Sequence, residues 1–339
     1  MKRNMKQWLN EILQEKQKKP LPVLSFPAIQ LMNITVRELI ADSDLQAKAM
    51  KLLADRLDTA ASVSQMDLSV EAECFGSDVR YFDDEVPTVV GSVVKDLADA
   101  EKLAIPQVGS GRTGIYIEAV SKAVDLIQDR PVLAGVIGPF SLAGRLMDVT
   151  TALMNCFEKP DMVHLVLEKV TEFQIQYCQV YQKAGANGVV MAEPLAGLLS
   201  PALAAEFSAP YVKRIISEVQ TDDFIVIYHN CGDYVKQMLD SILSTGASGY
   251  HFGNKINLAE ILPLMPPDKL TMGNLDPAGE LKNGTPASVM QQTKKIMADC
   301  AAYPNFLISS GCDIPAMSPW ENIDAFFQAV QEFYQTQQS

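Results

Sequence analysis

The sequence Tyr228-His229-Asn230-Cys231-Gly232-Asp233 directly follows an apolar run at residues 224–227. A second cluster, Ser309-Ser310-Gly311-Cys312-Asp313, follows another short apolar run at residues 306–308. Runs of this length and composition are typical of buried strands. Both clusters are therefore expected at the exits of strands, where barrel enzymes carry their chemistry.

One histidine and two cysteines of these clusters form a candidate zinc site. Zinc binds imidazole nitrogen and thiolate sulfur, and its catalytic sites keep a fourth position open. His229, Cys231 and Cys312 supply three such ligands. The alternative is that His229 is a hydrogen-bonded interior residue and that both cysteines are small buried apolar side chains. The strand-end positions favour zinc, and the alternative stays open at this point.

Short apolar runs alternate with helical patterns along all 339 residues. Eight strand–helix units predict an α/β fold, a TIM (β/α)8 barrel with an N-terminal helical extension, as a single domain over residues 1–339. A doubly wound open sheet is the alternative, but no Gly-x-Gly-x-x-Gly follows the first strand. The eight strands are expected at residues 21–26, 62–70, 131–138, 188–192, 224–227, 247–252, 269–273 and 305–309.

Several features between the strands carry their own expectations. One long helix is predicted over residues 35–57, and residues 77–112 are predicted to be an insertion near the barrel mouth. Ser318-Pro319-Trp320-Glu321 has the pattern of a capping box at the start of the last helix. Glu71 is expected to be a salt-bridge partner, and His164, within a helical pattern, to be structural.

Charge and hydropathy restrict the partners and the location. The net charge of −13 and the lack of a basic stripe disfavour nucleic acid and anionic lipid surfaces. No run approaches the ~20 apolar residues of a membrane span. Residues 1–20 form an amphipathic helical pattern without the continuous apolar core of a signal peptide. We expect a cytoplasmic protein whose N-terminal helix covers the barrel bottom, with a membrane-surface helix as the weaker alternative.

With these elements in place, the chain resembles the uroporphyrinogen decarboxylase superfamily. Within it, the sequence is most similar to the cobamide-dependent methyltransferases, which pass a methyl group from a methylated corrinoid protein to coenzyme M. The resemblance covers nearly the whole chain, and it implies that His229, Cys231 and Cys312 are the zinc ligands. Its anchors are Gly138-Pro139, His229-x-Cys231-Gly232, Gly273-Asn274 and residues 311–319 followed by Glu321-Asn322.

The resemblance implies further site residues. Asp67 falls where the decarboxylases keep a catalytic aspartate, and Glu73 falls where the methyltransferase branch has a glutamate. Glu193 stands where aspartate is usual, and His251 departs from that branch's acidic pair. We expect Glu193, His251 and Asn274 to contact the substrate. Two alternatives stay open, namely Asp67 as a solvated or helix-capping carboxylate and His251 as a buried structural residue.

These observations favour a zinc-dependent methyltransferase. The expected reaction moves a methyl group from a protein-bound methylcobamide to a small thiol acceptor such as coenzyme M, with a corrinoid protein as partner. Decarboxylation of a porphyrinogen-like polycarboxylate is the first alternative. However, residues 25–36 contain no arginine, whereas the decarboxylases carry an arginine-rich motif there to hold substrate carboxylates. Non-catalytic binding of a corrinoid or tetrapyrrole is the second alternative.

Overall fold

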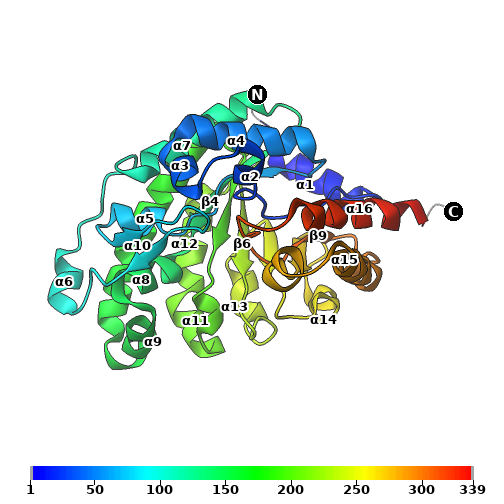
Figure 1. The fold of residues 1–339 in the computed structure, drawn as a ribbon. Coiled ribbons are helices and arrows are strands. Elements are labelled where there is room, and N and C mark those ends of the chain that lie inside the picture. The colour runs from blue at the N-terminus through cyan, green and yellow to red at the C-terminus, as the bar shows by residue number, and fades with distance from the viewer. Residues whose placement is uncertain (1–2, 337–339) are drawn as a thin grey trace.

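The computed structural model describes residues 3–336 and shows a parallel sheet curled into a barrel (Figure 1). Seven strands lie in the order β1-β4-β5-β6-β7-β8-β9, and each neighbouring pair is parallel. The TIM-barrel-like α/β fold expected from the sequence is confirmed. The strands are β1 Ser62–Val63, β4 Val132–Ile137, β5 Gly188–Ala192, β6 Ile225–Asn230, β7 Gly249–Phe252, β8 Leu270–Leu275 and β9 Phe306–Ser310.

The first predicted strand is not a regular strand in the structure. Pro20 and Pro22 lack a backbone N–H, so this segment cannot form a continuous ladder. It nevertheless lies between the two edge strands. The N–H of Leu21 donates to the carbonyl of Ile308 in β9 at 3.0 Å, and the carbonyl of Pro20 accepts from Ala60, just before β1, at 3.0 Å. The segment therefore closes the barrel in place of an eighth strand.

The second predicted strand is also wrong in its length, because only its first two residues form β1. The chain then turns into the short helix α5, Val70–Cys74. Asp67 Oδ1 accepts bonds from the backbone N–H of Ser69 at 3.0 Å and from the Ser69 hydroxyl at 2.6 Å. Such local side-chain bonds compete with strand pairing and favour a turn.

The single helix predicted over residues 35–57 is divided in two, α3 Val36–Ala41 and α4 Ser43–Arg56. Asp42 lies between them in an extended conformation, and its side chain accepts hydrogen bonds from the N–H groups of Asp44 and Leu45. A carboxylate in this position satisfies free donors at the start of a helix, so it caps α4.

The outer helices cover the sheet, and the shorter ones follow strand ends (Figure 1). The barrel helices are α7 Arg112–Leu126, α10 Pro160–Lys183, α12 Ala209–Val219, α15 Pro286–Cys300 and α16 Trp320–Thr336. The shorter elements are α2 Ala28–Met32, α8 Pro139–Met147, α9 Val149–Glu158, η1 Ala196–Leu198, α11 Pro201–Phe207, α13 Leu239–Ser244, α14 Leu258–Ile261, η2 Leu262–Leu264 and the π-helix η3 Pro277–Lys282. Among residues 3–336, no helix is long and apolar enough to cross a membrane.

The capping box predicted before α16 is not formed. Ser318 Oγ is buried and has no hydrogen-bond partner among the described residues. The carbonyl of Pro319 accepts from the N–H of Ile323 at 3.2 Å, so the helix begins one residue later than the sequence pattern predicts. Because Pro319 takes the cap position, the hydroxyl of Ser318 is left outside the first turn.

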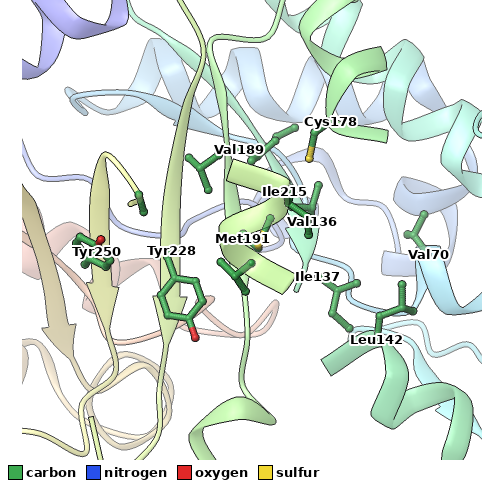
Figure 2. Close-up of a cluster of buried hydrophobic side chains, with 14 of the residues drawn as sticks. Val70, Val136, Ile137, Leu142, Cys178, Val189, Met191, Ile215, Tyr228 and Tyr250 are labelled. Carbon is green, nitrogen blue, oxygen red and sulfur yellow. The ribbon is translucent and has the colours of Figure 1, made fainter. Parts of the chain in front are cut away.

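Two buried clusters hold the barrel together. Figure 2 shows one of them, where side chains of β4 and β5 such as Val136 and Val189 pack against Cys178 of α10 and Ile215 of α12. The other fills the barrel interior with strand residues such as Leu133 and Ile227. Strands buried on both faces in this way explain the continuous apolar runs of the sequence.

Helix α1, Met5–Gln14, covers the N-terminal end of the barrel. Met5 and Ile12 are 0% and 4% exposed and belong to the interior cluster. The N–H groups of Met5 and Lys6 donate to the carbonyl of Asp222, just before β6. The end of the barrel that α1 covers is therefore opposite to the end where the strands lead into the site.

Residues 77–112 contain a two-stranded antiparallel hairpin, β2 Asp78–Arg80 and β3 Thr88–Val90, followed by α6 Leu97–Lys102. The segment contacts the barrel through the end of α8, where the N–H groups of Val93 and Val94 donate to the carbonyl of Leu146. Since α8 follows β4, the segment lies at the C-terminal side of the barrel.

Candidate active site

The structure brings His229, Cys231 and Cys312 together. One ligand atom of each lies within 4.8 Å of the others, although Cys312 is far from the other two in sequence. His229 is the fifth residue of β6, Cys231 follows the end of β6, and Cys312 follows β9. We call these residues the ligand trio. Their approach follows from the barrel, because the C-terminal ends of all strands meet at one mouth.

The imidazole of His229 is oriented for a ligand. Its Nδ1 lies 3.2 Å from the backbone carbonyl of His251, which can only accept, so Nδ1 carries the proton. Nε2 then has a free lone pair, and this buried atom has no hydrogen-bond partner among the described residues. Metal-binding histidines are usually held by such a bond at the other ring nitrogen.

The two thiols of the trio differ in their acidity. A hydrogen bond from Cys312 lowers the pKa of Cys231, in spite of burial, which acts in the opposite direction. The same hydrogen bond and burial raise the pKa of Cys312 to about 12. Cys231 is therefore the more acidic of the two thiols. A Cβ at Gly253 would lie 2.6 Å from Cys231 Cβ, so glycine lets the end of β7 pack against this cysteine.

His251 lies behind the trio and is completely buried, with 0% exposure. Its ring lies tilted by 35° to that of His229 at a centroid distance of 4.6 Å, and its Nε2 lies 2.7 Å from the carbonyl of Ser310. Burial holds the pKa of His251 well below its usual value, so the ring is neutral. The structure therefore gives His251 a supporting position, and its contact with substrate stays a prediction.

Asp67 and Glu73 both bind Arg112, the first residue of α7. Arg112 Nη1 lies 2.5 Å from Asp67 Oδ2, and its Nε donates to Glu73. Tyr116 donates to the same oxygen of Asp67 at 3.0 Å, and Tyr81 of the 77–112 segment donates to Glu73. These ion pairs fix the 77–112 segment against α5. The catalytic roles expected for Asp67 and Glu73 stay predictions.

The expectation that Glu71 forms a salt bridge is wrong. Glu71 is 1% exposed, and its Oε1 accepts a bond from the backbone N–H of Ile137 at 3.0 Å. Burial raises the pKa of Glu71 to about 7. The carboxylate therefore holds the end of β4 to α5 without a cationic partner in direct contact.

Glu193 and Asn274 are anchors of the surrounding backbone. Glu193 has 0% exposure, and it accepts bonds from the N–H groups of Phe140 and Ser141 at the start of α8 and from the Ser141 hydroxyl. Asn274 donates to the carbonyls of Gly253 and Ile256, both at 2.8 Å. It also lines a cavity of about 260 Å³ between the β7 loop and α15. Their substrate contacts stay predictions.

The model of the family named "Uroporphyrinogen decarboxylase (URO-D)" matches residues 23–333 of this chain. The chain belongs to the uroporphyrinogen decarboxylase family. The match spans every strand of the barrel, as the sequence resemblance implied.

Relatives within the uroporphyrinogen decarboxylase family include enzymes of two kinds. A protein of Methanosarcina acetivorans named methylcobamide:CoM methyltransferase MtbA is 28% identical over 272 residues, which cover 79% of this chain and 78% of the relative. A uroporphyrinogen decarboxylase of Myxococcus xanthus is 29% identical over 254 residues, covering 72% of this chain and 71% of the relative. This family member is accordingly an enzyme.

A solved structure supports the fold of this family member. A methyltransferase from Methanosarcina mazei superposes with a TM-score of 0.85 at 23% identity, and the match covers 98% of this chain and 99% of the other. At 23% identity this similarity shows a shared fold and nothing about function.

Two arginines of the mouth were missed by the sequence reasoning. Arg112 joins Asp67 and Glu73 across 45 and 39 residues of chain, a pairing that no local pattern indicates. Arg145 stands alone in the apolar helix α8 (Pro-Phe-Ser-Leu-Ala-Gly-Arg-Leu-Met). A single cation in an otherwise mostly apolar helical sequence is unusual, so the sequence could have indicated Arg145 as a candidate site residue.

Proposed function

We propose that this family member is a zinc-dependent methyltransferase that moves a methyl group from a methylated corrinoid to a small thiol acceptor such as coenzyme M. The observation that carries the proposal is the ligand trio, whose three ligand atoms lie within 4.8 Å of one another at the barrel mouth. Three side-chain ligands with a fourth position free are the pattern of a catalytic zinc site.

The residues of the trio fit zinc in three respects. Two sulfur atoms and one imidazole are ligands that zinc favours. His229 Nε2 is buried without a partner, and its Nδ1 is held by the carbonyl of His251. The hydrogen bond from Cys312 lowers the pKa of Cys231, which favours the thiolate form that binds a metal. Zinc bound here would deprotonate an acceptor thiol and hold the thiolate in the open position.

The remaining chemistry belongs to the protein's own residues. His251, fixed by Ser310, keeps the His229 ring in one orientation. The acceptor thiolate would attack the methyl carbon in line with its bond to the corrinoid cobalt, so the electron pair of that bond stays with the departing corrinoid. The corrinoid is large, and we propose that a corrinoid protein presents it at the mouth, in the cytoplasm.

The decarboxylase alternative is weaker, because few cations are free at the mouth. Residues 25–36 contain no arginine. Arg112 is bound to both Asp67 and Glu73. A porphyrinogen carries several carboxylates, and each buried carboxylate needs a cation or several hydrogen-bond donors.

Zinc content tests the ligand assignment. We expect about one zinc per chain, as in catalytic zinc sites. Cys231→Ala and Cys312→Ala should each lose most of it, because two ligands hold the ion poorly. Cys178→Ala is the matched control, since Cys178 is a fully buried cysteine of α10 outside the trio. Full zinc occupancy in both trio variants would show that the assignment is wrong.

Methyl transfer is tested with methylcobalamin as donor. Wild-type enzyme with coenzyme M should demethylate methylcobalamin, which is followed by the change in cobalamin absorbance. The Cys231→Ala variant should lose this activity, whereas the Cys178→Ala variant should keep it. Release of carbon dioxide from a porphyrinogen, with no demethylation of methylcobalamin by any thiol, would instead support the decarboxylase.

A further inference from the structure

Arg145 is a cation of the mouth that has no direct polar partner. Its side chain is partly buried, its Nε is fully buried and makes no hydrogen bond, and no ion pair of its guanidinium is found among residues 3–336. Burial lowers the pKa of Arg145, whereas the pKa of Arg112, which has two carboxylate partners, is raised. Burying a charge without a partner is costly. An anionic ligand would supply the missing partner and remove this cost.

The position of Arg145 places it beside the site. It lies three residues after Leu142, so both occupy the same face of α8. Figure 2 shows Leu142 next to Val70 of α5 and Ile137 at the end of β4. The charges of Asp67 and Glu71 act on Arg145 from this same side. The guanidinium therefore lies between α5 and α8, at the strand ends that lead into the mouth.

Neither nearby carboxylate is available to Arg145. Asp67 Oδ1 accepts two bonds from Ser69, and its Oδ2 accepts bonds from Arg112 and Tyr116. A carboxylate has about four acceptor sites, so Asp67 is saturated. Glu71 is held toward its neutral form by burial, and it already accepts a bond from Ile137.

We propose that Arg145 is a specificity-determining residue that binds one anionic group, a sulfonate or a carboxylate, on the acceptor. A guanidinium matches both groups with two parallel hydrogen bonds. The inference rests on the proposed methyl transfer in one respect, which is that the anionic group is assigned to the thiol acceptor. Because Arg112 is already paired with two carboxylates, Arg145 of α8 is the cation that, among the described residues, remains without a partner between α5 and α8, and it fits an acceptor with one negative charge.

Equilibrium binding tests the anion site without any turnover. The probes are ethanesulfonate and propionate, with ethyl methyl sulfone as the neutral counterpart, and calorimetry measures their dissociation constants. None of these probes carries a thiol. We expect the wild type to bind at least one anion and not the sulfone. The affinity for that anion should fall about 10- to 100-fold in Arg145→Gln, as expected for a charged hydrogen bond, and less in Arg145→Lys. The two anions distinguish a sulfonate site from a carboxylate site.

Arg214→Gln is the matched control, because Arg214 is a surface arginine of α12 paired with Glu168 and Glu172. It should bind the anions as the wild type does. Equal affinity in the wild type and Arg145→Gln, or no binding of either anion by the wild type, would overturn the proposal. If Arg145→Gln does not fold, the comparison between the wild type and Arg145→Lys decides in the same way.

Turnover gives a second readout. With 2-mercaptoethanesulfonate and the neutral 2-mercaptoethanol as acceptors, Arg145→Gln should lower kcat/KM about 10- to 100-fold for the anionic thiol alone. An equal loss for both thiols would show that Arg145 is merely structural. If no thiol is methylated but Arg145 still governs anion binding, the methyl-transfer proposal fails and the anion site stands.

Discussion

Glu71 shows how strongly the fold controls a single charge. It is buried beside β4, and burial raises its pKa from 4.5 to about 7. An unfolded chain releases this proton near pH 4.5, whereas the folded protein keeps it up to about pH 7. Between these values unfolding releases a proton. The contribution of Glu71 to stability is therefore fully present below pH 4.5 and is lost as the pH rises through about 7.

The pH dependence of unfolding tests this linkage. Glu71→Gln keeps the shape of the side chain and removes its titration. Compared with this variant, the wild type should lose about 3 kcal/mol of unfolding free energy between pH 4.5 and pH 7.5, measured by urea denaturation. Glu101→Gln, at an exposed residue of α6, should follow the wild type. Parallel pH profiles for the wild type and Glu71→Gln would contradict the neutral state of this carboxyl group.

At the scale of residues, the sequence predicted the trio but not the groups around it. His229 and Cys231 are close in sequence, and Cys312 follows a strand of its own, so strand-end positions were sufficient to bring them together. The partners of Asp67 were not predictable, because Arg112 reaches it only after α7 has packed against α5. Glu71 was misjudged, since the sequence does not reveal that a backbone N–H replaces a cationic partner.

Among the elements, α1 has a purely structural position. Met5 enters the barrel interior from the end opposite to the trio. Met5→Ala should lower the unfolding free energy by about 2–5 kcal/mol, the usual cost of truncating a buried methionine. The zinc content should remain unchanged, because α1 does not contact the site.

Met154→Ala is the matched control for this element, since Met154 on α9 is 51% exposed. It should change the unfolding free energy by no more than about 0.5 kcal/mol. Urea denaturation measures both variants. A Met5→Ala variant as stable as Met154→Ala would show that α1 does not close the barrel end in solution.

The strands differ in how well the sequence predicted them. From β4 to β9 the predicted and observed bounds agree to within three residues, because a parallel strand buried on both faces is a continuous apolar run. The first two predictions failed for local reasons that hydropathy does not capture. Prolines interrupt the ladder of the first segment, and Asp67 turns the second into α5. Asp42 divided a helix in the same way.

For the whole molecule, the barrel holds together without the trio. Its interior and outer clusters consist of apolar side chains from every strand and from the surrounding helices. Chelation of zinc should therefore abolish methyl transfer and leave the far-UV circular dichroism nearly unchanged, because the core of a domain this large does not depend on a metal. Loss of the circular dichroism signal on chelation would identify a structural metal site instead.

Barrel closure by residues 20–23 has a consequence for biosynthesis. The hydroxyl of Ser309 donates to the carbonyl of Leu21 across 288 positions of sequence, so the joint pairs an early part of the chain with a late one. The ribosome must have synthesised β9 before this contact can form, and contacts between segments so distant in sequence form slowly. Cys312 lies two residues after the end of β9. A nascent chain therefore cannot present the complete trio to a metal ion until the last strand has been synthesised and the barrel can close.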